Sequence, residues 1–268
     1  MIESSAQSLS TLESCDAPNL AMIRDISLDS VTKSYPRSGK VLDHVSFEVF
    51  RGQSVALVGS NGSGKSTLMR VCIGLTPIDQ GKVAILQNEI ANAGRKGLRA
   101  LRTRVGFVFQ HHNLVPRVSV LSNVIHGALA QKSSFLYWGH SFAPRAVRER
   151  ALSCLSRVGL ADLAQRRADQ LSGGQSQRVA IARALMQEPQ ILMADEPVAS
   201  LDPAAGEEVM QLFADLCRSD GLTLLFSTHH IEHALKYSDR IIGLTRGRKI
   251  IDSETSLINE STLRGIYG

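Results

Sequence analysis

Short apolar runs and helical stretches alternate along most of this chain. Alternating apolar and polar positions predict strands at 25–31 and 45–50, which pair through a turn at 36–39. Further strands are predicted at the apolar runs 55–58, 83–86, 105–109, 191–194, 223–227, 241–244 and 249–251. Helices are predicted at 68–73, 178–186 and 204–217. Strands that alternate with helices in this way predict an α/β core.

The stretch from about 112 to 170 interrupts this alternation and is predicted to be helical. Five apolar residues recur in it at spacings near 3.6, which predicts one buried helix face: Val147, Ala151, Leu152, Leu155 and Val158. We therefore expect a helical subdomain inserted between two halves of the α/β core. Its loop at 133–144 carries three aromatic residues, Phe135, Tyr137 and Trp138. They either pack within the small subdomain or form a contact surface for a membrane partner.

Composition narrows the setting of the protein. The 268 residues, 43% of them hydrophobic, are enough to bury a core, and the net charge of +5 is not gathered in a block. This favours a slightly basic surface over a nucleic-acid interface. Four cysteines without a CxxC pair favour neither a zinc site nor a disulfide framework, and they fit a reducing, cytosolic setting. No apolar run reaches 18 residues, so no membrane-spanning segment is expected.

The first residues of the chain differ from the rest. Residues 1–24 are polar and rich in serine, and they lack the basic start and apolar middle of a signal peptide. We expect a disordered tail there, followed by a single domain at 25–268.

A glycine-rich loop follows the strand at 55–58 and leads into the helix at 68–73. The loop fits the pattern GxxxxGK[ST] and consists of Gly59, Ser60, Asn61, Gly62, Ser63, Gly64, Lys65, Ser66 and Thr67. The strand–loop–helix context distinguishes a phosphate-binding loop from a chance match. We expect the backbone N–H groups of 62–66 to wrap a β-phosphate and Lys65 to reach the β- and γ-phosphates. The Ser66 hydroxyl is expected to ligate Mg2+.

A second candidate phosphate site lies at Ser172, Gly173, Gly174 and Gln175, ahead of the helix at 178–186. Two glycines let backbone N–H groups approach a ligand, and a helix N-terminus carries partial positive charge. The strand at 191–194 then leads into Asp195 and Glu196, which suit a metal-linked carboxylate and a base.

The distance between the turn at 172–175 and the acid pair at 195–196 limits whether both can act on one phosphate. At a helical rise of about 1.5 Å per residue, the acid pair at 195–196 is too far from the turn at 172–175 to serve the same phosphate. The simplest arrangement is two nucleotides shared between two copies of the chain.

The order of these motifs matches a known family. The loop at 59–67 is followed by Leu171-Ser-Gly-Gly-Gln, by an apolar strand that ends in Asp-Glu, by Ser200-Leu201-Asp202, and by Thr228-His229. In this order the motifs resemble those of ABC transporter ATP-binding subunits, over about residues 23–267. The resemblance implies a P-loop NTPase core with an antiparallel β subdomain and an inserted α-helical subdomain.

Three stretches narrow the resemblance further. Those that begin at Asn113, Ala168 and Asp195 are similar to the phosphonate importer branch of the family, which carries the Ala199-Ser200-Leu201-Asp202 variant. The run Thr228-His229-His230 is generic for the family and not typical of the phosphonate branch. A related oxyanion such as phosphite therefore remains an alternative as the transported solute.

The resemblance implies a role for each remaining motif residue. Glu196 would position and deprotonate the attacking water, while Asp195 and Gln110 would join the Mg2+ shell. His229 would contact the γ-phosphate; taken alone, such a histidine is more often structural. Tyr35 would stack on adenine, or else be a core aromatic. Asp202 would reach across a dimer, or else simply cap the helix that follows it.

The implied protein is an ATP hydrolase of an import complex, with ATP and Mg2+ as cofactors. Two copies would face each other head to tail, each ATP lying between the loop at 59–67 of one copy and residues 172–175 of the other. Membrane-embedded permease subunits and a periplasmic or lipid-anchored solute-binding protein would complete the complex, at the cytoplasmic side of the inner membrane and without nucleic acid. The cassette does not touch the cargo, so no residue names the solute.

Other classes of ABC protein remain as alternatives. DNA-repair members interrupt the cassette with long coiled coils, and translation factors carry two cassettes; this chain has neither feature. A subunit of a soluble carbon–phosphorus bond-cleaving complex stays open, as does an importer ATPase for another small solute.

Overall fold

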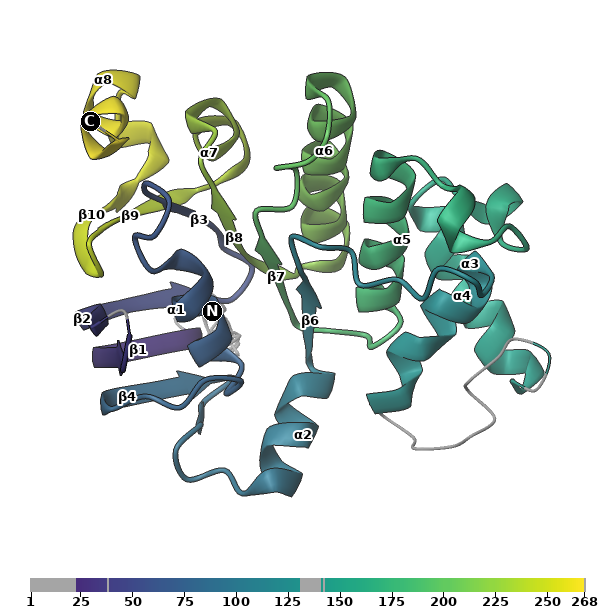
Figure 1. The fold of residues 1–268 in the computed structure, drawn as a ribbon, viewed down its shortest axis with the longest axis horizontal. Helices are drawn as coiled ribbons and strands as arrows, with labels where there is room; N and C mark the ends of the chain where they lie inside the picture. The colour runs from purple at the N-terminus through teal and green to yellow at the C-terminus, as the bar shows by residue number, and fades with distance from the viewer. Residues whose placement is uncertain (1–22, 38, 131–140, 142, 268) are drawn as a thin grey trace, which may run out of the picture.

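The computed structural model describes residues 23–37, 39–130, 141 and 143–267, and these residues form two sheets with helices around them (Figure 1). The first sheet is antiparallel, in the order β2-β1-β4-β5. Its strands are β1 (Arg24–Tyr35), β2 (Gly39–Phe50), β4 (Gln80–Ile85) and β5 (Asn88–Glu89). Residues 1–22 and 131–140, which include most of the expected tail and of the aromatic loop, lie outside the described residues.

The second sheet has the order β10-β9-β3-β8-β7-β6, and only the edge strand β10 runs antiparallel to its neighbour. Its strands are β3 (Ser54–Val58), β6 (Val105–Val108), β7 (Ile191–Asp195), β8 (Thr223–Thr228), β9 (Arg240–Thr245) and β10 (Arg248–Glu254). Every residue of β7 and β8 is buried, as expected for strands covered on both faces. The carboxyl ends of β3, β7 and β8 therefore meet at one edge of the sheet, where ligands of parallel sheets bind.

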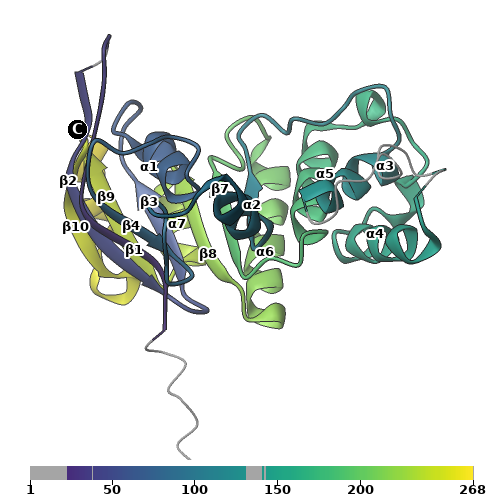
Figure 2. The same ribbon diagram turned by 90° about the horizontal axis from the view of Figure 1, so that it is seen from below.

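Helices cover both faces of the parallel sheet and form a separate layer beside it (Figures 1 and 2). They are α1 (Lys65–Cys72), α2 (Arg95–Thr103), α3 (Val120–Ile125), α4 (Arg145–Arg157), α5 (Gly173–Leu185), α6 (Pro203–Asp220), α7 (Ile231–Tyr237) and α8 (Glu260–Tyr267). The helical layer consists of α3, α4 and the adjoining α5, which contact one another. In the described part of the chain, no helix is both long and apolar enough to cross a membrane.

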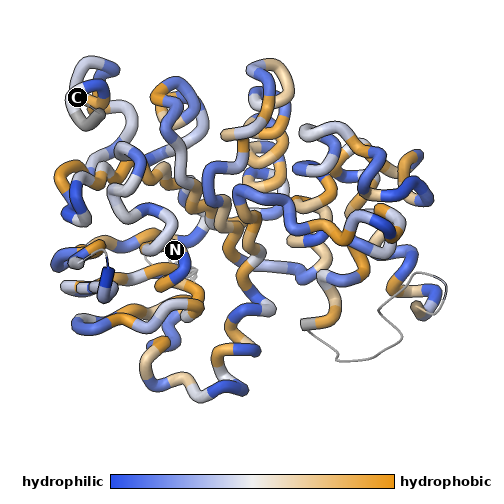
Figure 3. Tube along the Cα trace, in the orientation of Figure 1, coloured by the Kyte–Doolittle hydropathy of each residue, from blue (hydrophilic) through white to orange (hydrophobic). Residues whose placement is uncertain are grey.

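The parallel sheet separates two hydrophobic cores. Along β3, Val55 and Leu57 face a core shared with α1 and the antiparallel sheet, whereas Ala56 and Val58 face a core shared with α5 and α6. This alternation follows from the period of two along a strand. Figure 3 accordingly colours the central strands mostly orange, whereas blue and orange segments alternate along the helices. The rigid sheet between the two cores fixes the positions of the loops at its edge.

The α/β fold class with antiparallel and parallel sheets is confirmed, and several local expectations are corrected. The helix expected at 178–186 begins at Gly173, because Ser172 caps it. Leu152, expected on the buried face of α4, is 38% exposed, and Cys154 is buried on that helix instead. The short helices α2 and α7 were not predicted: α2 buries only Leu101, and α7, with seven residues, is too short to show a helical period over several turns.

Candidate functional site

The loop between β3 and α1 can be built only with glycine at two positions. Gly59 has φ of 151°, and a Cβ there would lie 2.2 Å from the carbonyl oxygen of Leu244. Gly64 has φ of 107°, and a Cβ there would lie 2.8 Å from the carbonyl oxygen of Val41. Backbone atoms of β9 and β2 therefore lie so close to the loop that neither position has room for a side chain.

Lys65 lies at the centre of this loop and is 4% exposed. Its Nζ donates to the carbonyl oxygens of Gly59 at 2.8 Å and Ser60 at 3.2 Å, and it lies 3.6 Å from Glu196 Oε1. The buried hydroxyl of Ser63 has no hydrogen-bond partner among the described residues. The loop thus holds one buried cation and unpaired polar capacity, which suits an anionic ligand.

The acid pair lies directly beside the loop. Asp195 ends β7 and accepts hydrogen bonds from the hydroxyls of Ser66 at 3.0 Å and Ser227 at 2.8 Å. The Ser227 hydroxyl in turn accepts from the N–H of Glu196 at 2.9 Å. Glu196 has φ of 46°, in the left-handed region that a non-glycine residue rarely occupies. Asp195 is therefore locked by two hydroxyls, while the Glu196 side chain turns toward Lys65.

Ser227 was not predicted from the sequence as part of the site. It lies opposite Asp195 in the register of β7 and β8. The available signal in the sequence was the position of Ser227, a residue with a hydroxyl group at the end of a buried strand, directly before Thr228. The signal could be used only once the order of the strands was known.

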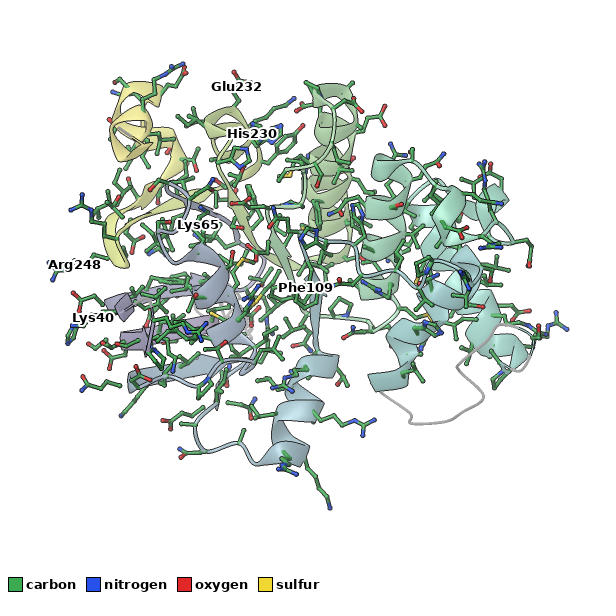
Figure 4. The ribbon with its side chains drawn as sticks, viewed as in Figure 1. Lys40, Lys65, Phe109, His230, Glu232 and Arg248 are labelled. Carbon is green, nitrogen blue, oxygen red and sulfur yellow. The ribbon has the colours of Figure 1, made fainter. Side chains whose placement is uncertain are left out.

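His229 follows β8 and faces the same acid. Its Nδ1 lies 3.8 Å from Glu196 Oε2. Its ring packs on His230 with centroids 4.2 Å apart, and His230 packs on His233 at 5.0 Å. Burial is the main cause that lowers the pKa of His230 and of His233, which favours the neutral form of both rings. Figure 4 labels His230 above Lys65 at this end of the sheet.

Two more candidate residues lie around this centre. Gln110 is exposed and comes two residues after β6, the strand next to β7. Tyr35 is the last residue of β1 and pairs with Gly39 across the hairpin; it is partly exposed and belongs to neither core. The Nζ of Lys33 lies 5.5 Å from the centroid of the Tyr35 ring. The alternative that Tyr35 is a core aromatic is therefore wrong.

The second phosphate candidate is the start of α5. Ser172 and Gln175 form a capping box, in which the Gln175 N–H donates to Ser172 Oγ and the Ser172 N–H donates to Gln175 Oε1. Asp202 caps α6 with its side chain alone, which accepts from the N–H of Ala205 at 3.0 Å. A Cβ on Gly174 would lie 3.3 Å from that of Ala205, so the two helix starts are adjacent.

The structure keeps the two phosphate candidates apart. A cavity of about 380 Å³ lies in front of α5 and is lined by Ser172, Gly174, Gln175, Arg178 and Glu208, among others, but by no residue of the loop at 59–67. In both Figure 1 and Figure 2, α1 and α5 stand on opposite sides of β7 and β8. A single chain therefore brings together residues 59–67, 195–196 and 229, and it does not bring the 172–175 turn to them.

Comparison with known proteins agrees with this architecture. The profile of the ABC transporter family matches residues 42–199. The phosphonates import ATP-binding protein PhnC 2 of Oceanobacillus iheyensis is 40% identical, and the match covers 91% of this chain and 95% of that protein. The phosphate-import ATP-binding protein PhnC of Mycolicibacterium smegmatis is 48% identical, with 84% and 86% covered.

Solved structures of similar fold include an ABC transporter cassette and a part of an ABC transporter complex. The bacterial cassette MJ0796, solved as a dimer, superposes with a TM-score of 0.76 at 35% identity, covering 86% of this chain and 98% of that one. The protein cbiO1 of Clostridium perfringens superposes with a TM-score of 0.77 at 30% identity, covering 87% and 89%. With the family profile matched and most of each chain shared, this chain belongs to the ABC transporter family as an ATP-binding subunit that hydrolyses ATP.

Proposed function

We propose that this chain is the ATPase subunit of an importer for phosphonate or a related phosphorus oxyanion. The proposal rests on one observation above all: Lys65, Ser66, Asp195 and Glu196 meet at the edge of the parallel sheet within hydrogen-bond or ion-pair distance. The solute is inferred from relatives, since similar proteins are named for import of phosphonates and of phosphate.

The loop at 59–67 binds the phosphates of ATP. Its backbone N–H groups wrap the β-phosphate, and Lys65 exchanges the carbonyls of Gly59 and Ser60 for the β- and γ-phosphates. Tyr35 stacks on the adenine ring, for which its partly exposed position at the end of β1 is suited.

The residues present fit Mg2+. The Ser66 hydroxyl and the Asp195 carboxylate lie 3.0 Å apart, and hydroxyl, carboxylate and amide oxygens are the donors that this hard cation prefers. Ser66, Asp195 and Gln110 hold the ion in this proposal. An ion held there would supply neutralisation of the charge that builds up on the phosphates during transfer.

Glu196 orients the attacking water and takes its proton. Its two carboxylate oxygens lie 3.6 Å from Lys65 Nζ and 3.8 Å from His229 Nδ1, so the acid stands between the group that binds the phosphates and the group that contacts the γ-phosphate. Phosphoryl transfer requires mainly positioning and charge stabilisation, which these three side chains supply.

Turnover requires a second copy of the chain. Each ATP lies between the loop at 59–67 of one copy and residues 172–175 of the other, and Asp202, beside the start of α5, reaches the same interface. The separation of α1 and α5 within one chain supports this arrangement. The γ-phosphate, present before hydrolysis and absent after it, supplies the differential affinity that closes and opens the dimer.

The dimer passes this motion to membrane-embedded permease subunits at the cytoplasmic face of the membrane. Gln110 and the helical layer form the contact side, and a solute-binding protein on the other face delivers the cargo. Nucleic acid takes no part.

A Glu196→Gln variant tests the proposal. It should bind MgATP and accumulate as a dimer, with hydrolysis about 10² to 10⁴ times slower, because general-base catalysis contributes a factor of that size. Size-exclusion chromatography and phosphate release measure both quantities. Glu188→Gln, which changes an exposed acid paired with Arg150, serves as the matched control and should behave as wild type. A Glu196→Gln variant that stays monomeric in saturating MgATP and hydrolyses at the wild-type rate would overturn the proposal.

Uptake assays of the assembled importer separate the candidate solutes. Uptake of a radiolabelled alkylphosphonate that is not displaced by excess inorganic phosphate supports the phosphonate assignment. Preferential uptake of phosphate or phosphite would make that ion the transported solute in place of phosphonate, and it would leave the proposed ATPase mechanism unchanged. Purification in a soluble complex without any membrane protein would support a carbon–phosphorus bond-cleaving complex instead.

A further inference from the structure

The side chain of Arg183 crosses from α5 to the loop that follows Gln110. Its Nη1 donates to the carbonyl oxygen of Asn113 at 2.6 Å, and its Nη2 donates to that of His112 at 2.7 Å. The planar guanidinium fork can hold two consecutive carbonyls at once, which a lysine ammonium, as a point donor on a flexible stem, cannot do in the same geometry. Arg183 therefore fixes both the position and the direction of the loop backbone.

The contact of Arg183 with the loop contributes little to the stability of the fold, because the charge of the guanidinium is partly removed from water without a salt bridge. Burial lowers the pKa of Arg183, and none of the acidic side chains in the described part of the chain forms a salt bridge with it. A half-buried cation that is held by neutral carbonyls has a desolvation cost that no carboxylate offsets. The geometry of the contact is a better explanation of Arg183 than its contribution to folding.

A second side chain holds the same loop from the same layer. Asn123 of α3 is fully buried, accepts from the N–H of Val115 at 2.8 Å and donates to the carbonyl oxygen of Val115 at 3.1 Å. The loop is thus anchored to α3 and α5. Its beginning, in contrast, is the exposed Gln110 that follows Phe109, which Figure 4 labels beside β6.

We propose that Arg183 is a positioning residue, which couples the position of Gln110 to the orientation of α5. The 172–175 turn lies at the start of α5, and Arg183 lies in its last turn. Because they belong to one continuous helix, the turn and Arg183 move together as a rigid body. A rotation that brings residues 172–175 against a nucleotide on a partner copy also pulls on residues 112–113. This inference rests on the roles proposed above for Gln110 and for residues 172–175.

Hydrogen exchange of the ATP-bound dimer tests the link. In a Glu196→Gln background, MgATP should slow exchange in peptides spanning 172–180 and 111–117 together. In Arg183→Lys and Arg183→Met, the 172–180 peptide should keep its protection, while the ATP-dependent protection of 111–117 falls at least tenfold. Arg218→Lys, on the exposed face of α6, is the matched control and should keep both.

The outcomes are distinguishable. Unchanged protection of 111–117 in both Arg183 variants would overturn the inference, and so would equal loss in both peptides, since that indicates general loosening. Arg183→Lys keeps the charge and the long stem, so it gives an answer even where Arg183→Met fails to fold. If the parent Glu196→Gln protein shows no ATP-dependent protection at 172–180, the proposed dimer itself is wrong.

The assembled importer provides a functional readout of the same link. With permease and binding protein present, the stimulation of the ATPase activity of Arg183→Lys by solute, expressed relative to the variant's own basal activity, should drop toward one. A stimulation ratio equal to that of wild type would contradict a positioning role.

Discussion

Two helices of this chain begin at glycine-containing turns suited to phosphate, and they begin in different ways. The N-cap of α1 is Gly64 in a left-handed conformation, with no side-chain capping bond. The N-cap of α5 is Ser172 in an extended conformation, with a complete capping box. At α1 the first N–H groups remain for a ligand, whereas at α5 the chain's own side chains bond the N–H groups of Ser172 and Gln175.

This difference shows which site can work alone. The α1 start has a buried lysine, an acid pair within reach and a loop whose glycines are held by contacts from β2 and β9. The α5 start is already capped by its own side chains, and it adds the field of the helix and the backbone N–H groups of Gly173 and Gly174, for which no hydrogen bond is seen within the described part of the chain. We therefore expect α1 to determine whether ATP binds, and α5 to determine whether bound ATP is turned over.

The largest expected effect separates these two roles. Lys65→Met removes the cation from the loop and should weaken ATP binding to the isolated chain at least 100-fold, because two charge-assisted contacts are each worth about 1.5–3 kcal/mol. Ser172→Glu places a negative charge at the α5 start. It should leave that binding within about threefold of wild type and reduce turnover about 10²- to 10³-fold.

Isothermal titration with an ATP analogue and phosphate-release assays measure the two quantities. Ser172→Thr, which keeps the hydroxyl, is the control for the α5 variant. Full ATPase activity in Ser172→Glu would show that α5 takes no part in turnover and would remove the reason for a shared site.

Glycine-to-alanine substitutions at the starts of α1 and α5 should change the free energy of unfolding by different amounts. Gly64→Ala forces a Cβ into a φ of 107° and within 2.8 Å of a backbone carbonyl, so the free energy of unfolding should fall by about 2–5 kcal/mol. Gly174→Ala lies inside a helix, where alanine is favoured by about 0.5–1 kcal/mol, and it meets only the Ala205 Cβ at 3.3 Å. Its change should stay within about 1 kcal/mol. Urea denaturation of both variants checks the contrast; equal losses would contradict it.

The smallest expected effect is the loss of the α5 cap. Ser172→Ala removes the acceptor for the Gln175 N–H, so the free energy of unfolding should fall by about 1 kcal/mol. Ser172→Asn, which can cap a helix equally well, should restore most of it. Thermal or urea unfolding measures both variants. No loss in Ser172→Ala would mean that water satisfies this helix start as well as serine does.

Local patterns predicted much of the site. The loop at 59–67 and the Asp195–Glu196 pair follow from short motifs whose chemistry depends on adjacent residues. Other features needed the fold. Ser227 reaches Asp195 only because β7 and β8 are neighbours, and Arg183 reaches loop residues that lie 70 and 71 positions away in the chain. Leu152 fits the helical period of α4 yet stays exposed, because periodicity does not reveal the width of the partner surface.

The sequence by itself determined the chemistry: a glycine-rich loop with lysine, an acid pair and a helix start with serine and glycines, each recognisable within a few residues. The tertiary structure decided which of them share a site. Hydrogen bonding between parallel strands brings residues 59–67, 195–196 and 229 to one edge, whereas the packing of α5 against α3, α4 and α6 holds residues 172–175 away from it. Spacing along the chain cannot express this separation, because it depends on the order of strands in the sheet and on the face that each helix covers.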